Sequence, residues 1–136
     1  MRKLFVGLGL AAVLGCGAGE AVAPAPYAAI AGAYSQALFN GDPMPYGDPT
    51  GQQVLGCTLD LSASGAYTET TTTRNNIDRS SQTLHGSGTF TSDGHNITTR
   101  SAPTGNAADW IGTVSGKTLT LQVRSTMGAV YVFVRP

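Results

Sequence analysis

Charged side chains are scarce in this sequence of 136 residues, where Asp, Glu, Lys and Arg together make up 12%. Eight basic side chains balance eight acidic ones, so there is no basic surplus with which to bind nucleic acid. Intrinsic disorder is associated with high net charge, which this chain does not have. We therefore expect a folded protein that does not bind nucleic acid.

Cysteine and histidine, from which disulfide frameworks and zinc sites are built, each occur only twice. No Cys, Asp or Glu stands at ligand spacing from His85 or His95, so we expect no metal and no cofactor. The nucleophile-elbow pattern Gly-x-Ser-x-Gly is missing, and glycoside hydrolysis would need two carboxylates in one site. We expect a protein that is not an enzyme, although a Ser-His-Asp triad assembled in space leaves no sequence signature.

No apolar run reaches the length of a membrane-spanning helix. The run at residues 4–14 has eleven apolar or small residues after Arg2 and Lys3, whereas a span needs about 20. A short apolar run behind a basic start predicts an export signal.

The run ends in Val13-Leu14-Gly15-Cys16, which resembles the lipobox of bacterial lipoproteins. The resemblance implies cleavage before Cys16, acylation of Cys16 and membrane attachment through it. With Gly17-Ala18 next and no Asp, it also implies outer-membrane sorting where the cell has two membranes. The alternative is a plain secretory signal with a chance cysteine. We expect a signal peptide at residues 1–15, an acylated cysteine with a flexible tether at 16–28, and one barrel domain at 29–136.

Short strands suit the remaining sequence, which is rich in glycine, threonine and serine. Leu55, Cys57, Leu59 and Leu61 alternate with polar or small residues, a period of two that predicts one buried face. Residues that favour turns separate the segments with this alternation. We expect eight strands, at residues 29–39, 55–62, 66–74, 82–91, 95–101, 107–114, 117–123 and 129–135.

The turns also predict the register of three hairpins. Around residues 62–65 we expect Leu61 opposite Tyr67 and, six residues back, Leu55 opposite Thr73. Asp93-Gly94 should place Phe90 opposite Ile97, and Ser115-Gly116 should place Trp110 opposite Leu121.

Eight strands joined only to their neighbours predict an all-β protein, an antiparallel up-and-down barrel of the size that holds one small ligand. Closure would also remove exposed sheet edges. The tight turns at 62–65, 92–95 and 115–116 fall at one end, which we call the floor. The longer connections at 40–52, 75–81, 102–106 and 124–128 fall at the other end, which we call the mouth.

Several short motifs occur in a consistent order along the predicted strands. They are Gly32-Ala33-Tyr34, Leu59-x-Leu61 followed by Gly65-x-Tyr67-Thr68, Gly88-Thr89-Phe90-Thr91, the run from Gly112 to Leu121, and Phe133-x-Arg135. Together, over about residues 30–136, they resemble the bacterial lipocalin-like lipoproteins. That resemblance implies a lipocalin-like barrel on a lipid anchor.

Candidate site residues fall at both ends of the predicted barrel. Closure should bring Arg135 onto Tyr34, with Glu69 as an ion-pair partner for Arg135 and Trp110 on the same floor; the alternative for Arg135 is a solvated C-terminal residue. Small inward residues toward the mouth predict a pocket for a small apolar ligand. The residues expected to line it are Leu38, Leu55, Cys57, Thr71, Thr73, Leu84, Thr99 and Tyr131.

Two functions remain open at this point. One is ligand binding by a hollow barrel at the cell envelope. The other is a structural or protein-interaction lipoprotein with a filled barrel, resembling a protease inhibitor or an envelope-assembly accessory, whose partner is unknown. A continuous interior cavity above about 300 Å³ would favour the first.

Overall fold

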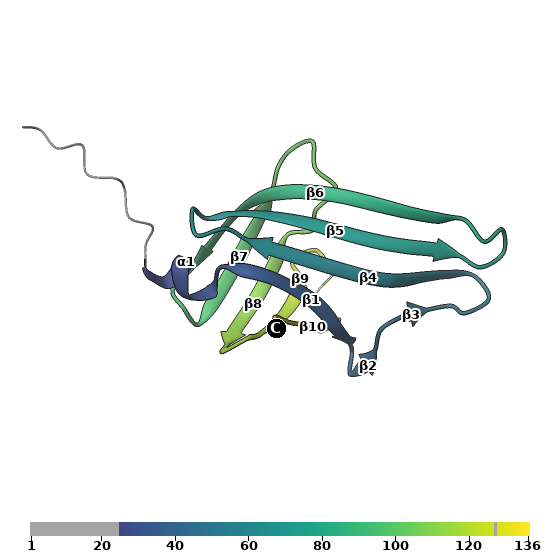
Figure 1. Cartoon of the computed structure of the whole chain (residues 1–136), viewed down its shortest axis with the longest axis horizontal. Helices are drawn as coiled ribbons and strands as arrows, with labels where there is room; N and C mark the ends of the chain where they lie inside the picture. Colours follow the sequence, from purple (N-terminus) through teal and green to yellow (C-terminus); the bar gives the residue numbers. More distant parts are fainter. Residues whose placement is uncertain (1–24, 127) are drawn as a thin grey trace, which may run out of the picture.

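Strands dominate the part of the chain that the structure describes (Figure 1). The computed structural model describes residues 25–126 and 128–136, so the predicted signal peptide, Cys16 and the first part of the predicted tether lie outside the described residues. The elements in chain order are α1 (Ala25–Ile30), β1 (Gly32–Phe39), β2 (Asp42–Pro43), β3 (Tyr46–Gly47), β4 (Gln52–Leu61), β5 (Ala66–Asn75), β6 (Ser81–Ser92), β7 (Asn96–Ser101), β8 (Trp110–Ser115), β9 (Thr118–Val123) and β10 (Tyr131–Val134).

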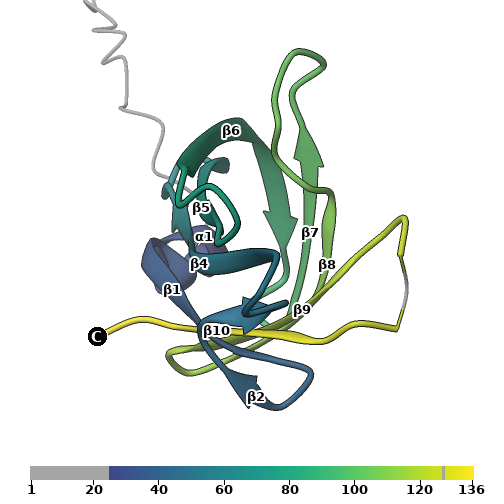
Figure 2. The ribbon, with the colours of Figure 1, turned by 90° about the vertical axis from the view of Figure 1, so that its right-hand side faces the viewer.

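One antiparallel sheet closes on itself through β1. The strand order is β2-β1-β10-β9-β8-β7-β6-β5-β4-β3, and β1 pairs with β4 as well as with β10. Figure 2 shows β1 and β4 to β10 arranged around a common interior, while β2 and β3 are two-residue additions in the connection between β1 and β4. The predicted eight-stranded antiparallel barrel is confirmed.

The inward residues of the strands form a single apolar core. The alternation predicted for β4 is observed, since Cys57, Leu59 and Leu61 are buried while Thr58 and Asp60 between them are exposed. Alternation of this kind fixes which face of each strand meets the interior. The buried hydrophobic residues are Ile30, Tyr34, Cys57, Leu59, Leu61, Tyr67, Phe90, Ile97, Trp110, Val114, Leu119, Leu121 and Phe133.

The register of the first predicted hairpin is right near its turn and wrong near its far end. Leu61 pairs with Tyr67 and Cys57 with Thr71, as expected, but Val54 rather than Leu55 pairs with Thr73. An extra residue between Val54 and Gly56 shifts the register there. A bulge of this kind leaves one residue unpaired, here Leu55, and turns it away from the core.

The other two predicted registers are each wrong by two residues, which is one full period of the alternation. Phe90 pairs with Thr99 rather than Ile97, because the β6–β7 connection is longer than a two-residue turn. Trp110 pairs with Val123 rather than Leu121, because the β8–β9 turn is Gly116-Lys117. Each error moves the pairing by two residues, so the predicted inward face of each strand is unchanged.

Helix α1 covers the floor of the barrel (Figure 1). The predicted tether was to run to residue 28 and the first strand to begin at 29, but Ala25–Ile30 is helical and β1 begins at Gly32. The Tyr27 ring lies 5.1 Å from the ring of Phe90, which ties the helix to β6. Among the described residues, no helix has the length and apolarity needed to cross a bilayer.

Candidate functional site

A cavity of about 190 Å³ lies inside the barrel, in its mouth half. The residues around it come from the mouth ends or middle of six barrel strands, from β3 and from the segment before β8. They are Gln36, Tyr46, Val54, Cys57, Glu69, Thr71, Ala108, Trp110, Val123 and Tyr131. In the floor half, Tyr34, Tyr67, Phe133, Leu59 and Leu61 are all less than 2% exposed. The barrel is therefore filled at its floor and hollow toward its mouth.

Glu69 is the buried carboxylate of this cavity, with 7% of its surface exposed. Its Oε2 accepts hydrogen bonds from Trp110 Nε1 at 2.9 Å and from the backbone N–H of Ala108 at 3.1 Å. Its Oε1 lies 3.4 Å from the Thr71 hydroxyl, whose single proton is shared between Oε1 and the Cys57 sulfur at 3.3 Å. Burial raises the pKa of Glu69, and these three hydrogen bonds oppose that shift because they stabilise the charged form.

The backbone of Ala108 reaches Glu69 because β7 and β8 separate at this end. Their ladder covers only three residue pairs, from Asn96 with Thr113 to Thr98 with Ile111. Beyond it the Thr99 hydroxyl accepts the Trp110 N–H at 2.8 Å and donates to the Ala108 carbonyl at 3.3 Å. Tyr67 also donates its hydroxyl to that carbonyl, at 2.9 Å. The backbone of Ala108 is thus held by two strands, β5 and β7.

Gly86 leaves space for the segment before β8, which contains Ala107 and Ala108. A Cβ at Gly86 would lie 2.2 Å from the backbone nitrogen of Ala107, which is closer than atoms can approach. Gly86 pairs with Glu69, so its missing side chain leaves space beside the carboxylate. Glycine in the middle of a strand often marks such a close approach of another backbone.

Cys57 and Tyr46, which also line the cavity, are held in their neutral forms near pH 7. Burial raises the pKa of the Cys57 thiol to about 12, with the nearby Glu69 carboxylate adding to the shift and a hydrogen bond from Thr71 opposing it. Burial, together with the neighbouring Tyr131, raises the pKa of Tyr46 to about 12. Cys57 is therefore an unreactive buried thiol, since the thiolate is the nucleophile.

The structure brings only some of the predicted pocket residues together. Cys57, Thr71 and Tyr131 line the cavity. Leu55 is 38% exposed outside the core, at the β4 irregularity, and Val54 faces the cavity in its place. Leu38 follows a similar irregularity in β1, which places Phe39 opposite Tyr131. The expectation that Leu38 and Leu55 line the pocket is therefore wrong.

The remaining predicted pocket residues lie outside the cavity lining. Thr73 and Leu84 are partly buried on β5 and β6, and Thr99 is buried at 2% exposure behind the Ala108 peptide. The pocket residues that the sequence interpretation missed are Gln36, Tyr46, Val54, Ala108 and Val123, together with Glu69 and Trp110, which it assigned to the floor. The inward glycines Gly86 and Gly88 were the available signal that a backbone segment enters here.

At the floor, Arg135 and Glu69 do not form the expected ion pair. The Arg135 guanidinium carbon lies 5.6 Å from the centroid of the Tyr34 ring, the contact that closure led us to expect. Arg135 also donates to the carbonyls of Ala31 at 2.7 Å and Ala29 at 3.2 Å, while Glu69 bonds to Trp110. Arg135 is therefore not a solvated terminal residue; it binds the end of α1, where carbonyls lack helical partners.

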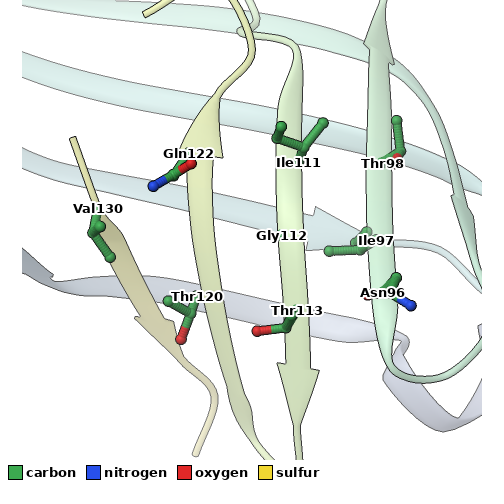
Figure 3. Close-up of a pocket in the computed structure, with 9 residues that line it drawn as sticks. All are labelled: Asn96, Ile97, Thr98, Ile111, Gly112, Thr113, Thr120, Gln122 and Val130. Atoms are coloured by element: carbon green, nitrogen blue, oxygen red, sulfur yellow. The ribbon is translucent and has the colours of Figure 1, made fainter. Parts of the chain in front are cut away.

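A second hollow lies on the outer face of β7, β8 and β9 (Figure 3). It is a shallow groove of about 450 Å³ whose outward side chains include Thr98, Ile111, Thr113, Thr120 and Gln122. No acidic, basic or cysteine side chain lines it. Within the described residues, no group of three or more His, Cys, Asp or Glu could hold a metal ion.

The class that the structure defines is an eight-stranded antiparallel barrel with a small cavity toward its mouth. Comparison of the chain with protein-family models, curated proteins and solved structures finds no match. The resemblance to bacterial lipocalin-like lipoproteins therefore stays a prediction.

Proposed function

We propose that this protein is a lipid-anchored lipoprotein of the cell envelope whose lipocalin-like barrel binds a small molecule in the mouth cavity. The observation that carries the proposal is the contrast between the two halves of the barrel. The floor is filled by fully buried side chains, whereas the mouth half keeps a cavity of about 190 Å³ with a buried carboxylate in its wall. A barrel of eight strands is the size at which one small ligand fits inside.

The size of the cavity limits the ligand. Most pockets for drug-sized ligands have about 300–1,000 Å³. At about 190 Å³ this cavity falls below the volume of about 300 Å³ that would have favoured a hollow barrel for such a ligand. The cavity has the volume of about six water molecules in the liquid. A long fatty-acyl chain does not fit. The expected apolar ligand is therefore revised toward a small one, with an apolar body against Val54 and Val123 and a polar end toward Glu69.

The position of α1 supports an orientation for the anchored protein. The chain enters the barrel through α1 at the floor, on the side opposite the long loops (Figure 1). If Cys16 carries the lipid, the floor faces the membrane and the mouth faces away from it. The orientation favours capture of a ligand from the surrounding medium over direct exchange with the anchoring bilayer.

Ligand binding is tested with a cavity-filling variant of the full chain. Val54→Phe should abolish the saturable NMR shift changes that a panel of small neutral, cationic and anionic compounds causes at cavity residues. Leu55→Phe adds a similar side chain one position along β4 but outside the cavity, and should leave them unchanged. If no compound in the panel shifts the cavity signals of the wild type, the small-molecule function is wrong.

Anchoring is tested separately, in cells. The wild-type chain should incorporate labelled palmitate and fractionate with membranes, and Cys16→Ser should lose both properties. Cys57→Ser is the matched control, because Cys57 is buried in the barrel and carries no anchor in this proposal. Equal labelling of wild type and Cys16→Ser would show that Cys16 carries no lipid, and a wild-type chain without label would favour a plain secretory signal.

A protein-interaction function is the second candidate. Ile77 in the mouth loop between β5 and β6 is 80% exposed, which is unusual for a large apolar side chain. It is tested by photo-crosslinking in cells from position 77, with the exposed Thr83 as the control position. A discrete adduct from position 77 alone would support this function, and identical patterns from both positions would argue against it.

A further inference from the structure

We propose that the ligand of the mouth cavity is a small organic ammonium ion, held between the Glu69 carboxylate and the aromatic rings of Tyr46, Trp110 and Tyr131. This inference rests on the proposed small-molecule function and names the chemical class of ligand for the same cavity.

The cavity is lined by one acidic side chain, Glu69, and by no basic one. Glu69 is buried, and its three hydrogen-bond donors are the neutral Trp110 indole, Ala108 amide and Thr71 hydroxyl. The indole and the amide can only donate, and two donors on one carboxyl oxygen stabilise the ionised form. No Lys, Arg or His lines the cavity. A buried charge without a counter-charge is costly, so a bound cation would offset a cost that this protein otherwise carries.

The two carboxylate oxygens of Glu69 differ in how fully they are hydrogen-bonded. Oε2 receives two short hydrogen bonds, whereas Oε1 receives one long bond of 3.4 Å from Thr71. A carboxylate oxygen accepts two hydrogen bonds or more. Both partners of this long bond, Glu69 and Thr71, line the cavity. We infer that Oε1 accepts an N–H donor there or contacts an alkylated ammonium group.

Three aromatic side chains line the same cavity as Glu69. Tyr131 lies between Trp110, at 5.0 Å between ring centroids, and Tyr46, at 6.4 Å, and all three rings line the cavity. Phe39 stacks on Tyr46 at 4.1 Å and supports it from behind. Aromatic rings attract organic cations through their quadrupoles, most strongly where water is excluded. Neither Tyr46 nor Cys57 supplies a second negative charge near pH 7, since burial raises the pKa of each to about 12. The negative charge in the cavity is therefore that of Glu69.

The test uses a cation and its neutral isostere on the full chain. Choline and 3,3-dimethylbutan-1-ol share their shape and differ in one positive charge, and both have about seven heavy atoms, close to the capacity of the cavity. Trp110 is the sole tryptophan of the sequence and bonds to Glu69, so its fluorescence reports on the site directly. We expect choline to change this fluorescence saturably and to bind at least about tenfold more tightly than the isostere.

Two variants separate the cavity charge from the charge of the whole protein. Glu69→Gln should weaken choline binding at least about tenfold while leaving binding of the isostere nearly unchanged. Asp60→Asn removes one negative charge from the exposed face of β4 and should change neither. Choline binding that Asp60→Asn and Glu69→Gln reduce equally would show non-specific attraction and overturn the proposal.

A measurement on the wild type keeps the test valid should Glu69→Gln fail to fold. The carboxyl ¹³C signal of Glu69, followed by NMR across pH, should show a lower pKa with choline than without it, because a nearby cation favours the charged form. The isostere should not lower it. Equal binding of choline and isostere would overturn the ammonium class and leave small-molecule binding standing. If neither choline nor the isostere binds, and no compound of the panel shifts the cavity signals, the proposed function itself is overturned.

Discussion

Glu69 is an acidic residue whose burial follows from its place in β5. It stands between Tyr67 and Thr71 on the inward face, opposite Leu59, and inward residues of this strand meet the barrel interior whatever their polarity. The cost of that position is reduced by hydrogen bonds from Trp110, Ala108 and Thr71. A buried acid kept with such support at a cavity wall is typical of a binding site.

The free energy of unfolding should depend on pH through the titration of Glu69. Burial raises the pKa of Glu69 above its ordinary value of 4.5, so the folded state holds the proton more tightly than the unfolded chain. The free energy of unfolding contributed by this residue therefore decreases as pH rises from about 4.5 through the folded-state pKa. Glu69→Gln removes this contribution, so its stability relative to the wild type should increase over that pH interval.

Urea denaturation of both proteins between pH 4 and pH 8 measures this difference. The nearby Cys57 and Tyr67 do not interfere, because burial raises the pKa of each above its ordinary value and thus away from this range. The exposed Asp93 titrates lower, since hydrogen bonds from Asn96 and His95 lower its pKa to about 2. Parallel stability curves for wild type and variant would show that the pKa of Glu69 is the same in the folded and unfolded states.

At the scale of the strand, β6 depends on glycine where other backbones come close. A Cβ at Gly88 would lie 2.1 Å from the Arg100 carbonyl oxygen and 2.6 Å from Cε1 of Tyr67. Gly88→Ala should lower the free energy of unfolding by about 1–3 kcal/mol, the usual cost of overpacking. Gly56→Ala is the control, because a Cβ there meets nothing within 4 Å and should change stability by less than about 0.5 kcal/mol. Chemical denaturation measures both, and equal values would refute the close-approach argument.

The sequence predicted the regular alternation of inward and outward residues in the strands, but not the irregularities that interrupt this alternation in β1 and β4. The period of two in Cys57, Leu59 and Leu61 predicted the inward face of β4, and eight such segments predicted the barrel. The irregularities before Gly56 and Leu38 were not predictable, because an extra residue in a strand changes the phase without leaving a turn residue behind.

The candidate site was predicted less well than the fold, for a related reason. Cys57, Thr71 and Tyr131 sit on regular stretches of strand and were placed correctly at the cavity. Ala108 reaches Glu69 from an irregular segment, through a backbone N–H that every residue type except proline carries. No side-chain pattern could identify it. Trp110 was expected at the floor, and its hydrogen bond to Glu69 shows that it belongs to the cavity instead.

Across the whole molecule, the two ends of the described chain hold each other at the floor. Arg135 joins the carbonyls of Ala29 and Ala31 to the ring of Tyr34, and the Tyr34 hydroxyl donates to the Ile30 carbonyl at 2.8 Å. Arg135→Ala should lower the free energy of unfolding by about 1–2 kcal/mol, since it removes charged hydrogen bonds and a cation–π contact that are partly exposed to water.

Amide hydrogen exchange distinguishes this effect from a general loss of stability. In Arg135→Ala the amides of α1 should exchange faster even where the barrel amides keep their protection. Arg74→Ala, at an exposed site on β5, is the matched control and should leave both unchanged. Unaltered exchange in α1 of the Arg135 variant would mean that the helix is held by its other contacts, those of Tyr27 with Phe90 and of Tyr34 with Ile30.

The double pairing of β1 has a consequence for how the chain folds. β1 bonds to β10, and Arg135 to Ala31 across 104 residues, so the barrel cannot close until the last strand has been made. Folding rates fall as the sequence separation of native contacts grows, and all-β chains with such contacts fold in about milliseconds to seconds. The closed barrel therefore forms only after the whole domain has been synthesised, however early β1 pairs with β4.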